Sequence, residues 1–435
     1  MTKFLPRALL LLALGVSGCG SATANLPGGA GDLGLIEAAM QQVQKSYVVP
    51  VQPDQLVSGS LKGMLSKLDP HSDYMTEREY RELISTTSGQ FGGVGIEISV
   101  EEGVPQVIAA IDGTPASAAG IEPGDRIVKA DGQPIVGMDI GEVVRKLRGA
   151  PGTRVVLTIA RANHPTFDVP IMRAIIHIDS VKAELKPGRI GYARVSTFDE
   201  NTQTQLRDAI ARMRRQAGGN FAGFVLDLRN DAGGLLDSAV DVTSDFLDRG
   251  TVVTTRGRET DENRIYDAPP NGDLIRGTPM VVLINGASAS ASEIVAGALQ
   301  DNRRATVLGT RSFGKGSVQS IIPLEGRGAL RLTTALYYTP SGRSIQGQGI
   351  TPDRVVTLPK DQQVANAVVT YESDLFGALK APGALAPQRA PARPAGRPVT
   401  GEADHPINPK IIGSAQDAQL NAALEVFGGS RAAAR

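Results

Sequence analysis

Three serines stand among small residues in NGASASASEIVAGALQ, residues 285–300, directly before a segment with a helical pattern. A serine that attacks a carbonyl group needs a neighbouring base to take its proton. Histidine is the usual partner, but none of the four histidines is close to this stretch in sequence: they are His71, His164, His177 and His405. A different base therefore has to be considered.

A lysine is the next candidate for the base. Lys315 lies 25 positions after the middle serine, Ser290, in GTRSFGKGSVQ, residues 309–319. A lysine acts as a general base only where burial or nearby charge disfavours its ammonium form. The flanking glycines let backbone come close, and Phe313 can help to exclude water. Taken alone, however, this segment is more typical of a solvated turn.

The lysine segment also approaches two other motifs. GTRSFGKG nearly fits the phosphate loop G-x-x-x-x-G-K-[ST], but Gly316 replaces the hydroxyl that binds magnesium, and SVQSIIPL predicts a strand where a helix should begin. SFGK fits the S-x-x-K motif of penicillin-recognising enzymes, with Ser312 as nucleophile. Its glycines disfavour the required helix start, and the motifs S-D-N and K-T-G are absent. A penicillin-recognising acyl-enzyme using Ser312 remains a weak alternative.

Composition limits the class of partner, and the N-terminus indicates the compartment. Lysine plus arginine and aspartate plus glutamate both number 45, and tryptophan is absent, so nothing favours nucleic acid. Residues 1–24 have a basic start and an apolar run too short to span a membrane, which predicts an export signal. VSGC places the lone cysteine, Cys19, like the acylated residue of bacterial lipoproteins, so lipidation is favoured over an ordinary signal cut after Ala24.

The hydrophobic pattern divides the remaining chain into four parts. Residues 34–90 predict amphipathic helices, and residues 91–174 alternate β-rich runs with one helix, DIGEVVRKLRG. Strands and helices alternate over 175–360, which indicates a layered α/β domain. Residues 361–435 combine a Pro/Ala-rich linker at 380–404 with a last helix, DAQLNAALEVF.

Residues 91–174 resemble a PDZ domain, in FGGVGIEI, ASAAGIEPGDRIVKADGQPI and the helix ending KLRG. The glycine-bearing loop can turn backbone N–H groups toward a peptide carboxylate, and the strand after it offers an edge to an extended peptide. We expect the peptide site at Phe91, Gly93, Val94, Gly95 and Ile96. A β-domain without ligand is the alternative. Arg148, in KLRG, is either a helix C-terminal cation or a link that reports groove occupancy to the core.

The serine and lysine segments together resemble the catalytic region of the C-terminal processing proteases, the tail-specific serine peptidases of family S41. LDPHSDYM, FVLDLRNDAGGLL and YYTPSGRSIQGQGITPD agree with this, in the family's order from about residue 35 to 360. The resemblance implies an α/β multidomain protein with a helical N-terminal segment, an inserted PDZ domain, a layered catalytic core of ClpP/crotonase type and a helical C-terminal tail.

The resemblance also implies the site residues: Ser290 as nucleophile, Lys315 as base and Gln319 as the residue that orients the lysine. A serine at a helix N-terminus suits this role, because the N–H of Ala291 can donate to the oxyanion. The second donor is expected from Gly233 or Gly234, and the sequence does not choose between them.

We therefore expect an extracytoplasmic serine endopeptidase without cofactor that binds protein substrates by their C-terminal tails. A membrane lipid anchor at Cys19 and a homodimer through the helical ends are further candidates. Asp69, His71 and Asp73 favour a structural turn over a metal site, and no H-E-x-x-H is present. A PDZ scaffold with an inert core is the alternative to an enzyme.

Overall fold

The computed structural model describes residues 30–101, 103–111, 113–364, 370–380 and 406–433. The predicted export signal with Cys19 lies outside these residues, as does the predicted linker apart from its first residue. The chain divides into two compact units, residues 1–60 and 61–435. Within the described ranges, no helix combines the length and the apolar character that a membrane span requires.

The helices predicted over residues 34–90 are present. The first unit holds α1 (Ala30–Ser46) and the start of α2 (Pro53–Leu65). In the second unit, the short strand β1 (Asp73–Met75) precedes α3 (Glu77–Thr87). Thr76 caps α3: its hydroxyl accepts from the N–H of Glu79, and its own N–H donates to the Glu79 carboxylate.

The next part of the chain is a β-rich domain, in agreement with the predicted PDZ fold. Its main sheet is antiparallel, with strands in the order β3-β4-β5-β7-β8 and β6 beside β5. β2 pairs separately with β9, and the elements lie along the chain as follows: β2 (Gln90–Gly93), β3 (Ile96–Glu101), β4 (Val104–Ala110), α4 (Pro115–Ala118), β5 (Arg126–Ala130), β6 (Gln133–Pro134), α5 (Ile140–Leu147), β7 (Arg154–Ala160), β8 (Phe167–Met172) and β9 (Ala174–His177). The predicted helix is α5, whereas the sequence reading had not distinguished the short α4.

The following part of the chain, the core domain, contains a six-stranded sheet in the order β10-β11-β12-β15-β16-β19. The strands from β11 to β19 pair in parallel, and β10 adds an antiparallel edge. Their bounds are β10 (Val181–Lys186), β11 (Ile190–Val195), β12 (Gly223–Asp227), β15 (Met280–Ile284), β16 (Thr306–Gly309) and β19 (Arg354–Val355). This is the layered α/β domain predicted from the alternation of strands and helices.

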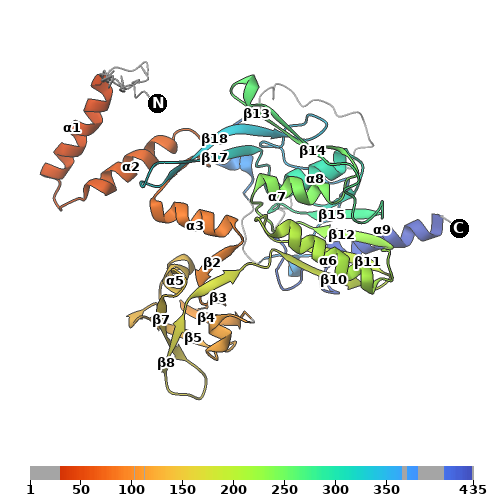
Figure 1. The fold of residues 1–435 in the computed structure, drawn as a ribbon, viewed down its shortest axis with the longest axis horizontal. Coiled ribbons are helices and arrows are strands. Elements are labelled where there is room, and N and C mark those ends of the chain that lie inside the picture. The colour runs from red at the N-terminus through yellow and green to blue at the C-terminus, as the bar shows by residue number, and fades with distance from the viewer. Residues whose placement is uncertain (1–29, 102, 112, 365–369, 381–405, 434–435) are drawn as a thin grey trace, which may run out of the picture. The chain divides into compact units, whose positions relative to one another are not determined.

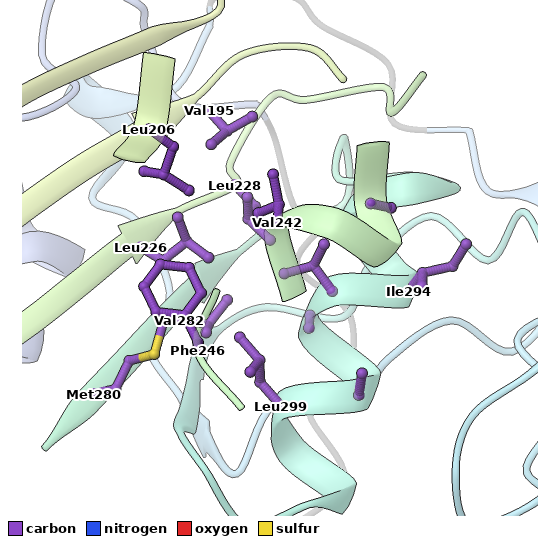
Figure 2. Close-up of a cluster of buried hydrophobic side chains, with 14 of the residues drawn as sticks. Val195, Leu206, Leu226, Leu228, Val242, Phe246, Met280, Val282, Ile294 and Leu299 are labelled. Carbon is purple, nitrogen blue, oxygen red and sulfur yellow. The ribbon is translucent and has the colours of Figure 1, made fainter. Parts of the chain in front are cut away.

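Helices cover both faces of this sheet, since parallel strands must be buried on both sides. Alternate strand residues such as Leu226 and Val282 pack against α6 (Thr202–Gln216), α7 (Leu236–Ser244) and α8 (Ala291–Asp301), as Figure 2 shows. The residues between them, such as Val225 and Val281, face α9 (Ala418–Ala433) on the other side. α9 contains the last helix predicted from the sequence.

A second, antiparallel sheet completes the core (Figure 1). Its order is β1-β18-β13-β14, and β17 pairs with β18. The strands are β13 (Gly250–Gly257), β14 (Arg264–Ala268), β17 (Ser317–Pro323) and β18 (Ala329–Tyr338). Outside the sheets, the described residues also form short 3₁₀ turns at η1 (Thr260–Glu262), η2 (Lys360–Gln362) and η3 (Glu372–Asp374). The second sheet positions the lysine segment, because β17 begins two residues after Lys315.

A buried ion network ties α9 to the core sheet. The Arg229 guanidinium, just beyond the end of β12, is fully buried. It donates to both oxygens of Asp227 and to both oxygens of Asp417, which lies directly before α9. Two carboxylates thus share one guanidinium in a site without water-exposed atoms, and they fix the C-terminal helix beside the strand end.

Candidate active site

Ser290 lies directly before α8, in a strained backbone conformation. Its φ of 56° and ψ of −112° fall in a region that costs a non-glycine residue roughly 1–3 kcal/mol. Neighbouring contacts hold it there: the N–H of Ala289 donates to the carbonyl of Asp231 at 2.9 Å, and the N–H of Ser290 donates to Glu293 Oε2 at 2.8 Å. The strain presents the serine at the mouth of a helix, where the N–H of Ala291, the first residue of α8, has no acceptor among the described residues.

Glu293 joins the serine segment to the lysine segment. Its Oε2 accepts from the backbone N–H of Ser290 and from that of Lys315, at 2.8 and 2.9 Å. Its Oε1 accepts from the N–H of Gly314 at 2.7 Å and from the hydroxyl of Ser312. One side chain therefore brings the backbone of the two predicted catalytic residues to a single oxygen atom.

Glu293 is fully buried, and burial raises the pKa of its carboxyl to about 7, against the lowering effect of the four hydrogen bonds. Sequence reasoning did not assign this residue a role. A signal was present, because Ser290 and Glu293 have the S-x-x-E spacing of a capping box. Here the N-cap residue is the candidate nucleophile, and the glutamate also reaches a second loop.

Lys315 meets the condition that a lysine base requires. Burial lowers the pKa of its ammonium, and the positive charge of Arg331 lowers it further, while the carboxylates of Glu372, Glu293 and Asp69 act in the opposite direction. Among the hydrogen bonds and ion pairs of the described residues, none engages its Nζ. Lys315 therefore loses its proton at a lower pH than a solvated lysine does.

Tyr337 and Gln319 lie beside this pair on the second sheet. The Tyr337 N–H donates to the carbonyl of Gly316, and its phenol lies near enough to the Ser290 side chain for this neighbour to lower the pKa of the phenol. Burial raises the pKa of that phenol. Gln319 Nε2 donates to the hydroxyls of Ser317, at 2.9 Å, and Thr333, at 3.4 Å. In this conformation its amide is bonded to these hydroxyls and not to the lysine.

The glycine turn after β12 lies against the serine. A methyl group added to Gly233 would stand 2.8 Å from the Ala291 nitrogen and 2.9 Å from the Ser290 Cβ. The N–H of Gly233 already donates to Asp231 Oδ1 at 2.8 Å. For Gly234, no acceptor of its N–H is present within the described part of the chain. The structure thus distinguishes two glycines that the sequence left equivalent.

The residues predicted to bind a peptide share one cavity of about 120 Å³. Five of its lining residues are those named from the sequence, and three apolar side chains and one arginine complete it: Ile98, Val144, Leu147 and Arg148. β3 lies at the edge of the sheet, and its partner among the described strands is β4. The other side of β3, beside the cavity, can therefore pair with an extended peptide.

Arg148 belongs to this cavity. Its guanidinium carbon lies 4.4 Å from the centre of the Phe91 ring, and its N–H caps α5 by donating to the carbonyl of Val144. These contacts place a positive charge at the glycine-bearing loop. The expected link from Arg148 to the core stays a prediction.

The turn at residues 69–73 supports the core from the N-terminal side. Asp69 Oδ1 accepts from the N–H groups of His71 and Ser72, at 2.8 and 2.9 Å, as in a structural turn. The imidazole of His71 contacts Glu372 at 2.8 Å, and the Thr333 hydroxyl donates to Asp69 at 3.1 Å.

Known families match three parts of this chain. Residues 189–356 match Peptidase family S41, residues 106–161 match the PDZ domain, and residues 19–79 match the N-terminal domain of the activating protease CtpB. The carboxy-terminal-processing protease of Bartonella bacilliformis is 48% identical over 343 residues, which are 78% of this chain and 79% of that protein. The carboxy-terminal processing protease CtpA of Bacillus subtilis is 32% identical over 341 residues, 78% of this chain and 72% of its own length.

Among solved structures, the photosystem II D1 C-terminal processing protease is 29% identical, with a TM-score of 0.44, and the match covers 76% of this chain and 94% of that one. The identity to the Bartonella protein extends over most of both chains, and the matched S41 and PDZ regions occur in the expected order. The chain therefore belongs to peptidase family S41, as a carboxy-terminal processing serine protease that carries a PDZ domain.

Proposed function

We propose that this protease uses Ser290 as nucleophile and Lys315 as general base, and that it works outside the cytoplasm on protein C-terminal tails. The observation that carries the proposal is the shared oxygen of Glu293, which accepts from the backbone of both residues. A half-buried lysine with a lowered pKa and a strained serine at a helix start further support the assignment.

In the proposed mechanism, neutral Lys315 takes the hydroxyl proton of Ser290 as its oxygen attacks the substrate carbonyl. The N–H groups of Ala291 and Gly234 stabilise the oxyanion, because both are donors without an acceptor among the described residues beside the serine. Lys315 then protonates the leaving amine, and the same residue activates the water that hydrolyses the acyl-enzyme.

Gln319 is proposed to assist by orienting Lys315, as the family resemblance implies. In this conformation its amide donates to hydroxyls instead. A role in catalysis therefore requires the amide to turn toward the lysine. The irregular pairing of β17 with β18 between Val318 and Gln319 marks where the strand departs from regular geometry.

Substrate recognition is proposed to begin at the PDZ cavity. The peptide would extend β3 at its open edge, and its last side chain would enter the pocket formed with Val144 and Leu147. The guanidinium of Arg148 lies over the Phe91 ring, at the loop where the peptide carboxylate is expected, and would supply a matching charge. Unfolded, damaged or precursor proteins have the free chain ends that such a groove requires.

The extracytoplasmic setting is supported by residues 1–24, whose pattern is that of an export signal, and the lipid anchor is proposed at Cys19. A homodimer through the helical ends remains a proposal from the sequence. Ser312 is a poor alternative nucleophile, since it is fully buried and its oxygen is occupied by Glu293 and by the N–H of Ile350.

The test is cleavage of a disordered protein with an apolar C-terminal residue, read by mass spectrometry. Wild type should cleave it, and Ser290→Ala and Lys315→Ala should each lose at least about 100-fold in rate, because the nucleophile and base act together. Ser312→Ala tests the alternative nucleophile: it should still cleave measurably, although it removes one bond to Glu293. Cleavage by Ser290→Ala at the wild-type rate would contradict the assignment. A substrate with an amidated C-terminus should be cut more slowly if the PDZ cavity selects the carboxylate.

A further inference from the structure

Glu372 is a buried carboxylate that the mechanism above does not use. It begins the turn η3, far in sequence from both catalytic segments, and it is fully buried. The imidazole Nε2 of His71 lies 3.0 and 2.8 Å from its two oxygens. The Gln346 amide donates to its Oε1 at 2.8 Å. A carboxylate with this many partners is held in one place.

These partners hold the lysine loop, residues 313–316, on both sides of Lys315. The N–H of Glu372 donates to the carbonyl of Phe313 at 3.1 Å. Gln346 Oε1 accepts from the N–H of Gly316 at 2.9 Å, so the residue bonded to the carboxylate also fixes the position directly after the lysine. A methyl group on Gly316 would lie 2.3 Å from the Gln346 nitrogen, which shows how closely the two segments pack.

The charges around Lys315 come from four elements. Glu372, on η3, favours the ammonium, as do Glu293 on α8 and Asp69 in the turn before β1; Arg331 on β18 opposes them, and burial has the largest effect. Arg331 is tied into the same network, because its Nε donates to the carbonyl of His71 at 3.0 Å. The ring of His71 thus contacts the Glu372 carboxylate, which favours the lysine ammonium. Its backbone carbonyl accepts from Arg331, which disfavours that ammonium.

We propose that Glu372 is a positioning residue for Lys315. Through Gln346 and its own backbone it fixes the lysine loop, and its negative charge, balanced against that of Arg331, sets the pH at which Lys315 becomes neutral. Glu372 can act in this way only if Lys315 is the base proposed above. The segment after residue 360 then forms part of the catalytic machinery, although it contributes no group to the reaction itself.

The experiment is the pH dependence of kcat/KM for a fluorogenic peptide, which reports ionisations of the free enzyme. Glu372→Gln keeps an oxygen for Gln346 but removes the charge, so the midpoint of the rising limb should move to lower pH, by about one unit. Arg331→Gln keeps a donor for the His71 carbonyl and removes the opposite charge, so its midpoint should move to higher pH, by about half a unit because Arg331 is partly exposed.

Asp245→Asn is the matched control, a buried carboxylate paired with Arg207 near the end of α7. Its midpoint should equal that of wild type. Equal midpoints in all three variants, or shifts of Glu372→Gln and Arg331→Gln in the same direction, would overturn the proposal. If Glu372→Gln does not fold, Gln346→Ala, which removes the link from Glu372 to Gly316 and keeps the charge, should lower kcat/KM across the pH range; unchanged kcat/KM would overturn the positioning role. Lys315→Ala separates failure of the proposed base from failure of the proposed role of Glu372. Cleavage by Lys315→Ala at the wild-type rate refutes the base. If Lys315→Ala is inactive but the midpoints of the Glu372 and Arg331 variants do not shift, only the role of Glu372 is refuted.

Discussion

Replacing Asp231 by asparagine should stabilise the protein at alkaline pH and change its stability little at acid pH. Asp231 is fully buried beside the glycine turn. Its Oδ1 accepts from the N–H of Gly233, but its Oδ2 has no hydrogen-bond partner among the described residues. Burial raises the pKa of this carboxyl from 3.8 to about 7. Asparagine keeps the Oδ1 acceptor and cannot ionise.

The size of the effect follows from that pKa. Because the folded protein binds the proton more tightly than the unfolded chain, the stabilisation from protonation is complete below about pH 4 and is lost as the pH rises to about 7. A difference of about 3 pH units corresponds to roughly 4 kcal/mol. The free energy of unfolding of Asp231→Asn should therefore exceed that of wild type by up to about 4 kcal/mol above pH 7. The gap should shrink toward zero near pH 4.

Thermal unfolding of both proteins across this pH range measures the gap. At about 2–4 °C per kcal/mol, the melting temperatures should differ by roughly 10 °C at alkaline pH. Asp168→Asn, which alters an exposed carboxylate bonded to Thr158, is the control and should change stability by less than about 0.5 kcal/mol. If the curves of wild type and Asp231→Asn run parallel from acid to alkaline pH, burial does not perturb this carboxyl and the reasoning is wrong.

Three further substitutions test the supports of the site. Glu293→Ala leaves three backbone N–H groups without their acceptor, so it should cost about 1–3 kcal/mol for each and abolish cleavage; a folded, active variant would contradict the bridging role. Asp417→Ala takes one carboxylate from buried Arg229 and should cost about 3–5 kcal/mol in urea unfolding; a smaller loss than for an exposed aspartate would refute this. Gly234→Ala puts a methyl group 2.1 Å from the Phe198 carbonyl oxygen at a φ of 152°, so the backbone must shift and carry the Gly234 N–H away from the oxyanion. We expect kcat to fall while KM changes little, and an unchanged kcat would exclude this glycine from the oxyanion site.

The layers of the fold could be predicted because each periodic segment forms the element that its pattern indicates. Strands such as β12 and β15 are continuous apolar runs between helical segments, which is typical of a parallel sheet covered on both faces. The second sheet was not separated from the first, because β13 and β18 are distant in sequence and their pairing depends on long-range contacts. Local pattern carries no information on such pairings.

The sequence could name candidate site residues, but it could not name the residues that support them. Ser290 and Lys315 lie in segments long enough to be recognised, whereas Glu372 and Tyr337 reach the same place through contacts between segments far apart in the chain. Gln319 shows the other limit, since a motif position does not fix the rotamer of its side chain. The choice between two adjacent glycines required the direction of their N–H groups, which only coordinates supply.

The docking of α9 has a consequence for the time at which the enzyme becomes active. Asp417 holds Arg229, and the carbonyl of Ile407 accepts from the Asn230 side chain, beside the turn that contacts the serine. Ile407 and Asp417 are synthesised long after Ser290. A growing chain therefore contains its proposed nucleophile before this turn is secured. We expect a chain that stops at residue 405 to be inactive, and full activity of such a chain would contradict this. We therefore expect peptidase activity to begin only after the C-terminal helix has docked.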